Sequence, residues 1–159
     1  MGLLSMHSVG AFTKMTALAL TLALTSSNSA NAADKFAEIC SGTETLQVGT
    51  QPPKKLPYTL TFSADLTTKS YCYDVCDPDQ AYAISDSSSQ PIKLSDFDDD
   101  DRQTGGQRRL ITFDRRSKIL TDFWVLNAGG LGTVVKNATA TCRASAFHQP
   151  APLPNLERH

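Results

Sequence analysis

Four cysteines carry the chemistry that this sequence shows most directly: Cys40, Cys72, Cys76 and Cys142. An even number of cysteines in an oxidising compartment favours two disulfides, and spacing alone leaves three pairings open. A Cys40–Cys142 bridge would close a loop of about 100 residues and give the larger entropic stabilisation. It leaves Cys72 with Cys76, and since residues four apart in a straight strand lie about 13 Å apart, the chain between them must bend.

Two other uses of the cysteines fit less well. A redox C-x-x-C motif has two intervening residues, whereas Cys72 and Cys76 are separated by three. Four-cysteine zinc sites usually consist of two short-spaced pairs, and this chain has only one. Structural disulfides are therefore the expected state.

An acidic run offers a second chemistry. Asp96, Asp98 and Asp100 have the every-second-residue spacing that presents carboxylates to calcium. The match to a calcium-binding EF-hand loop fails where glycine and glutamate are required, because those positions hold Asp101 and Gln107. The competing interpretation is a solvated acidic loop that interacts with nearby arginines.

Arg108 and Arg109 could bind an anion such as a phosphate, a sulfated sugar or a lipopolysaccharide head group, since guanidinium groups match planar or tetrahedral oxyanions. The competing interpretation is neutralisation by the acidic run. In the expected strand over residues 119–126, both faces carry large apolar residues. We expect Phe123 to lie in the core and take Trp124 as a candidate for ligand binding.

Catalytic signatures are absent from the sequence. After the N-terminal segment only His148 and His159 remain as histidines, both at or beyond the last expected strand. There is no G-x-S-x-G, H-E-x-x-H or phosphate-binding glycine motif. Paired carboxylates from separate loops leave no local pattern. We expect a protein that is not an enzyme and needs no cofactor, with a hydrolase of unrecognised type as the alternative.

The charge is divided between the two halves of the chain. Residues 34–101 hold 13 acids and 5 bases, net −8, and residues 102–159 hold 3 acids and 9 bases, net +6. The whole chain carries −1, so it offers no global field for nucleic acid, and few aromatic residues lie between the basic clusters.

The N-terminus predicts export. Residues 15–24 form an apolar run of ten after Lys14, too short for the roughly 20 residues of a membrane span. Ala30 and Ala32 provide small residues for cleavage after Ala32. We expect a cleaved signal peptide over residues 1–32 and a periplasmic or extracellular protein with no membrane span.

Alternating patterns in the remainder indicate strands. The strongest runs over 58–66, where Tyr58, Phe62 and Leu66 share one face. Asp34 could begin a single helical turn that ends at Gly42, and Pro52, Pro53 and Pro57 should keep the segment before residue 58 out of any sheet. The other expected strands are 71–75, 81–85, 91–94, 110–114, 119–126 and 131–143.

The predicted architecture is mainly β: a small antiparallel barrel or sandwich with at most one or two short helices, stabilised by disulfides. It comprises a single domain over residues 33–147 and a proline-rich, mobile or extended tail over 148–159. The expected role is binding of an envelope glycan or protein, with an inhibitor-like protein-binding module as a further alternative.

Overall fold

The computed structural model describes residues 34–101, 105–129 and 132–153, and the predicted signal peptide lies outside these ranges. The strands are β1 (Lys35–Val48), β2 (Lys54–Asp65), β3 (Ser70–Tyr73), β4 (Ala81–Ala83), β5 (Ile92–Asp101), β6 (Gly105–Asp114), β7 (Ile119–Asn127) and β8 (Thr133–Ala144). One antiparallel sheet contains all eight of them, in the order β4-β3-β2-β1-β8-β7-β6-β5. A bridge between Asp86 and Lys93 links the two ends of this order, so the sheet forms a nearly closed barrel.

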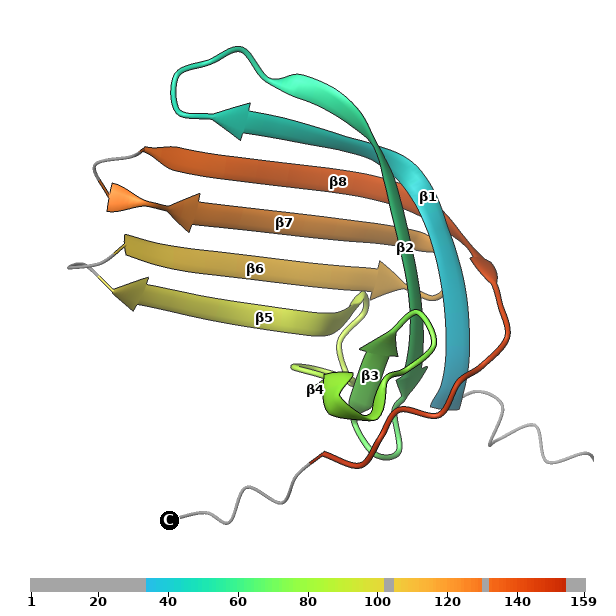
Figure 1. The fold of residues 1–159 in the computed structure, drawn as a ribbon. Helices are drawn as coiled ribbons and strands as arrows, with labels where there is room; N and C mark the ends of the chain where they lie inside the picture. The colour runs from blue at the N-terminus through green and yellow to red at the C-terminus, as the bar shows by residue number, and fades with distance from the viewer. Residues whose placement is uncertain (1–33, 102–104, 130–131, 154–159) are drawn as a thin grey trace, which may run out of the picture.

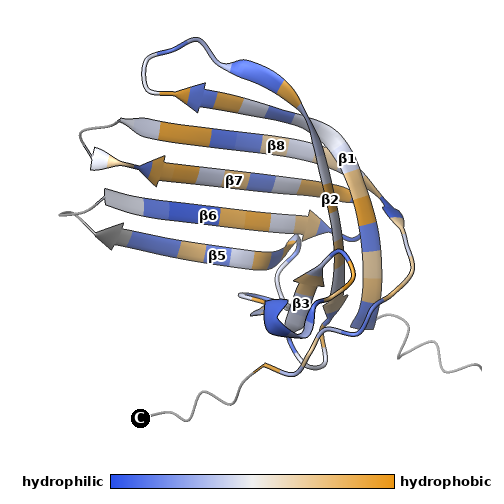
Figure 2. Ribbon diagram, in the orientation of Figure 1, coloured by the Kyte–Doolittle hydropathy of each residue, from blue (hydrophilic) through white to orange (hydrophobic). Residues whose placement is uncertain are grey.

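The predicted fold class is confirmed, and it is the barrel rather than the sandwich. Four long strands, β5 to β8, lie side by side, while β1 and β2 curve across and carry the short β3 and β4 at their far end (Figure 1). Hydrophobic and hydrophilic bands alternate along the long strands (Figure 2), because successive side chains point into and out of the barrel.

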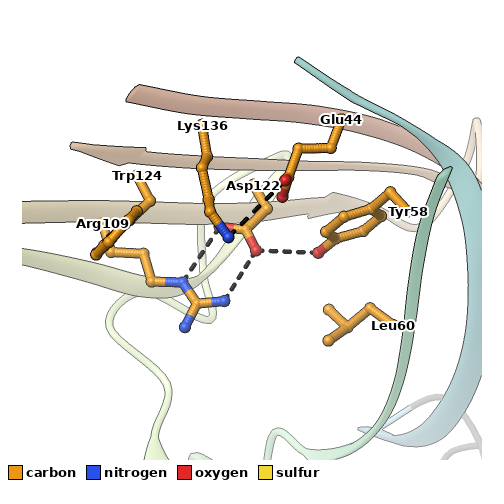
Figure 3. Close-up of a pocket in the computed structure, with 7 residues that line it drawn as sticks. All are labelled: Glu44, Tyr58, Leu60, Arg109, Asp122, Trp124 and Lys136. Atoms are coloured by element: carbon orange, nitrogen blue, oxygen red, sulfur yellow. Dashed lines mark hydrogen bonds and ion pairs between the residues drawn. The ribbon is translucent and has the colours of Figure 1, made fainter. Parts of the chain in front are cut away.

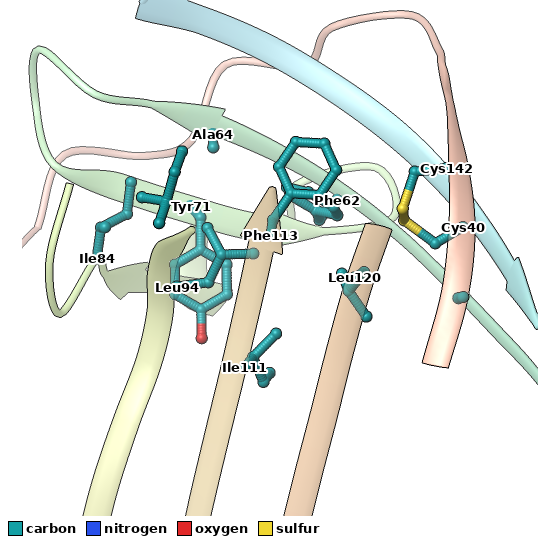
Figure 4. Packing of buried hydrophobic residues seen from close by; sticks show 12 residues of the cluster. Cys40, Phe62, Ala64, Tyr71, Ile84, Leu94, Ile111, Phe113, Leu120 and Cys142 are labelled. Carbon is teal, nitrogen blue, oxygen red and sulfur yellow. A yellow bond between two sulfur atoms is a disulfide. The ribbon is translucent and has the colours of Figure 1, made fainter. Parts of the chain in front are cut away.

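Three aromatic rings form the core at one end of the barrel, which we call the core end. The ring centroid of Phe113 lies 5.4 Å from that of Phe62 and 5.6 Å from that of Phe36. Leu120 is fully buried beside them, and Figure 4 shows the cluster between the strands. Burial of large apolar side chains at this end is the main source of stability.

Both disulfides are present, with the pairing that loop length favoured. Cys40 and Cys142 face each other across β1 and β8, with Cα atoms 3.9 Å apart. Cys72 and Cys76 are joined with Cα atoms 5.1 Å apart. The bend that this bridge requires is made by Asp74 and Cys76, both of which have positive φ.

The predicted helical turn after Asp34 is wrong, because these residues begin β1. Phe36 and Cys40 are four apart, and that spacing places two residues on the same side of either a helix or a strand. Gly42 does not end a helix but lies within β1, where an added Cβ would be 2.0 Å from the Thr139 carbonyl oxygen. Glycine is needed there for close approach of β1 to β8.

Two further expectations about the sheet are corrected. Pro57 lies within β2, paired with Thr43 of β1; it is tolerated because β3 joins β2 only from Phe62 onward, which leaves the other side of Pro57 at a sheet edge. The acidic run is not a loop but part of β5. It pairs with β6, which places Asp98 opposite Arg108, and opposite charges at facing positions are favourable in a sheet.

The C-terminal segment lies against the core end as far as it is described. The backbone N–H of His148 donates to Ser63 Oγ, and Gln149 Nε2 donates to Asp65 at 3.0 Å. Lys35 completes this group, with its Nζ 3.2 Å from the same carboxylate.

Candidate functional site

The candidate site lies on the inner face of the barrel, away from the phenylalanine core. Arg109 of β6, Trp124 of β7 and Lys136 of β8 are consecutive cross-strand neighbours. Inward positions closer to the core end on these strands hold Ile111, Leu120 and Ala140. The inner face therefore changes from apolar to charged and aromatic within single strands.

An ion pair organises the centre of this site. Arg109 donates to Asp122 twice, from Nε at 3.2 Å and from Nη2 at 2.8 Å. Tyr58 Oη donates to the same carboxylate at 3.0 Å, as Figure 3 shows. The Asp122 side chain is only 10 % exposed, whereas that of Arg109 is 38 % exposed. The buried carboxylate thus holds a guanidinium that remains accessible.

The protonation states of these groups follow from their contacts. The hydrogen bonds to Asp122 raise the pKa of Arg109, against the opposing effect of burial. Burial, together with the charge of Asp122, raises the pKa of Tyr58 above its usual range. Arg109 therefore stays charged, and Tyr58 stays a hydrogen-bond donor.

Two cavities flank Arg109 and Trp124, which line both of them. The first, which we call the polar cavity, has a volume of about 290 Å³. Small inward residues help to leave this space, since Ala138 lies directly opposite Asp122 and Glu44. Its other lining residues are Glu44, Tyr58, Leu60, Asp122 and Lys136.

The second cavity, the tyrosine cavity, has a volume of about 230 Å³. Tyr71, Tyr73 and Tyr82 pack against one another with ring centroids 5.4 to 5.5 Å apart. Burial raises the pKa of Tyr71 and of Tyr73, so both keep their hydroxyl protons. The other residues that line this cavity, apart from the shared pair, are Ser95, Phe97 and Gln107.

All four tyrosines and the single tryptophan of the chain line these two cavities. They come from β2, β3, β4 and β7, so they meet only because the sheet curls into a barrel. The wall is shortest at this place, since β3 and β4 have 4 and 3 residues. Concentration of amphipathic aromatics around charged groups is typical of a ligand site rather than of a core.

The residues proposed from sequence divide between the two faces of the barrel. Trp124 and Arg109 point inward and line the cavities. Arg108 points to the opposite face, where its Nε lies 3.9 Å from Asp98, so the two arginines do not form one anion site. Phe123 is only half-buried and lies outside the core cluster, so its prediction as a core residue is wrong.

The described side chains of the predicted calcium ligands do not come together in one site. Asp96 pairs with Lys93 at 2.9 Å, and Asp98 is 61 % exposed beside Arg108. The side chain of Asp100 lies outside the described residues. Within the part of the chain that the structure describes, no three histidine, cysteine or acidic residues are grouped to hold a metal ion.

Sequence reasoning missed most of the site. Asp122 shares its strand face with Leu120 and Trp124, and a lone acid on an otherwise apolar face was the available signal. The sequence places Tyr58 on a strand face but does not indicate that it belongs to a site. The tyrosines of β3 and β4 gave no signal, because nothing local shows that they meet Arg109.

No family model matches the chain, and comparisons with curated proteins and with solved structures found no match. Among the described residues, no helix is long and apolar enough to cross a membrane.

Proposed function

We propose that this protein is a non-enzymatic binding domain whose barrel takes a small, ring-containing, hydroxyl-rich ligand of the saccharide type. The observation that carries the proposal is the Arg109–Asp122–Tyr58 cluster, assembled beside the indole ring of Trp124 in an accessible cavity. Preassembly matters because little side-chain entropy is then lost when a ligand binds.

The lining chemistry supports a saccharide. Sugar rings present apolar C–H faces that pack on aromatic rings, and hydroxyls that need both donors and acceptors. The polar cavity offers both, since Lys136 lies 3.8 Å from Glu44 and Arg109 contacts Asp122. Two cations and two carboxylates balance there, which suits hydroxyl groups.

Binding is favoured over catalysis by the way Asp122 is held. It accepts three hydrogen bonds, two from Arg109 and one from Tyr58, which leaves little acceptor capacity for proton abstraction from a ligand. No histidine lines either cavity among the described residues. A hydrolase acting in the polar cavity would have to rely on Glu44, so Glu44→Gln would abolish any hydrolysis there.

We also propose that the protein acts outside the cytoplasm, in the periplasm or the extracellular medium. Two disulfides with no free cysteine among the described residues support an oxidising compartment. The N-terminal export pattern is in keeping with this location. Mass determination of the secreted protein should give an N-terminus at Ala33; recovery of the uncleaved chain from the cytoplasm would contradict it.

The single tryptophan provides a direct test. The full chain with intact disulfides would be titrated with disaccharides built from hexose, hexosamine and hexuronate units, following Trp124 fluorescence. At least one should shift the emission and raise the melting temperature. Arg109→Gln should abolish the shift, and Arg108→Gln, on the outer face, is the matched control. If no sugar shifts the emission or the melting temperature, the proposal is wrong.

A further inference from the structure

The guanidinium of Arg109 retains donors that point to a specific ligand group. Arginine has five N–H donors, and the two hydrogen bonds to Asp122 come from Nε and Nη2. Nη1 makes no hydrogen bond within the described residues, and in Figure 3 it faces away from the carboxylate. A planar fork whose orientation is already set by Asp122 is suited to an oxyanion.

The two cavities beside Arg109 differ in their hydrogen-bonding character. Both carboxylates, Glu44 and Asp122, line the polar cavity, whereas no acidic residue is found among the lining of the tyrosine cavity. The tyrosine cavity instead offers donors: the hydroxyls of Tyr71 and Tyr73 lie 3.4 Å apart. Because one of these two hydroxyls donates to the other, the proton of the remaining hydroxyl is left for a ligand oxygen. An acceptor-rich group therefore fits the tyrosine side, and a hydroxyl-bearing group fits the other side.

From this asymmetry we infer that the ligand is an acidic saccharide whose hexuronate ring occupies the tyrosine cavity with its carboxylate on Arg109. The inference rests on the proposed saccharide-binding function and adds the charge and the direction of the ligand. The neighbouring ring lies in the polar cavity with its hydroxyls toward Glu44. Arg109 and Trp124 form the boundary between the two rings, because they line both cavities.

The test compares three disaccharides on the wild-type chain: digalacturonate, its dimethyl ester, and neutral lactose. Digalacturonate should bind, and the ester should bind about 10- to 100-fold more weakly, as expected for loss of a charged hydrogen bond. Binding of digalacturonate should also weaken when NaCl is raised from 20 to 200 mM. Dissociation constants would come from Trp124 fluorescence and calorimetry.

Variants then test whether the preference for the acid over the ester depends on Arg109. Arg109→Lys keeps the charge but removes the fork, and it should reduce the preference for acid over ester; Arg108→Gln should keep that preference. Circular dichroism would confirm folding, and the wild-type acid-to-ester ratio is decisive even if a variant does not fold.

The failures can be told apart. Equal binding of acid, ester and lactose would overturn the acidic ligand but leave saccharide binding intact. Tighter binding of galactose 6-sulfate than of galacturonate would overturn the carboxylate in favour of a sulfate. Absence of binding by all of these sugars, and by the wider panel above, would overturn both proposals.

Discussion

The core end and the cavities of the barrel share the same strands but are built for different purposes. At the core end, Phe62 and Phe113 are fully buried and make edge-to-face contact. On β6, Arg109 lies two inward positions beyond Phe113. On β7, Asp122 lies one inward position beyond Leu120, and both residues line the polar cavity. The residues that stabilise the barrel and those of the proposed binding site are thus separated along it, so the cavity residues could change without a change in the core.

Two buried carboxylates show the same contrast. Asp65 at the core end accepts hydrogen bonds from the backbone N–H groups of Thr67 and Thr68 and from Gln149. These partners close a turn and hold the C-terminal segment, so Asp65 is structural. Asp122 is instead held by side chains alone, and its main partner, Arg109, is accessible to a ligand.

The largest difference between the two regions is expected from truncating an aromatic ring in each. Phe62→Ala should lower the free energy of unfolding by about 4 kcal/mol, because a fully buried ring leaves a cavity. Phe97→Ala, at a side chain that is 45 % exposed beside the tyrosine cavity, should cost about 1 kcal/mol or less. Urea unfolding at pH 7 measures both. Equal losses would show that the cavity wall is part of the stabilising core.

A second pair of variants compares lysines that face acidic residues. Glu38 is 1 % exposed and pairs with Lys118, while its Oε2 makes no hydrogen bond within the described residues. Lys118→Met should cost about 3 kcal/mol, because it leaves a buried carboxylate without its cation. Lys136→Met is the control, since Glu44 is more exposed, and should cost about 1 kcal/mol or less. A small loss for Lys118→Met would contradict the distinction.

Lowering the pH should destabilise the core end, because Asp65 becomes protonated. Burial alone would raise the pKa of Asp65, but hydrogen bonds led by Gln149 and Thr68 outweigh it and lower the pKa to about 2. Because the unfolded value is about 3.9, this stabilisation is present above pH 4 and is lost as the pH falls toward 2.

Wild type should therefore lose about 2 kcal/mol more than Asp65→Asn between pH 4.5 and pH 2. Unfolding by urea at several pH values measures the difference. Asp98→Asn, at an exposed position, should retain the wild-type pH dependence. If Asp65→Asn also retained the wild-type pH dependence, the hydrogen bonds at Asp65 would not be the cause of the loss of stability in acid.

The smallest effect is expected at Tyr58. Tyr58→Phe removes one of three hydrogen bonds to Asp122 and should cost about 1 kcal/mol of stability. Arg109 still holds the carboxylate through two bonds, so the orientation of the guanidinium should survive. Thermal unfolding and the digalacturonate titration measure the two properties separately. A complete loss of binding would show that Tyr58 contacts the ligand itself.

Local patterns predicted most of the strands, but they missed β1 and the acidic half of β5, and they did not predict the site. Period-two alternation places Ala138, Ala140 and Cys142 on one face of β8, and that face is the barrel interior. The same alternation cannot decide which of two apolar faces of β7 is inside, which is why the prediction of Phe123 as a core residue is wrong. The site depends on tertiary closure, because Tyr58 and Asp122 are 64 residues apart and meet only when the barrel forms.

The acidic segment of β5 has a consequence for self-association. On the side away from β6, no described strand pairs with β5 beyond Asp96, whose N–H donates to Ser85. Unpaired backbone groups at such an edge can recruit a second chain into a continuous sheet. The exposed side chains of Asp98 and Asp99 place negative charge at this edge. Like charges on two copies of this edge repel each other, so we expect the charge run to disfavour edge-to-edge pairing at neutral pH.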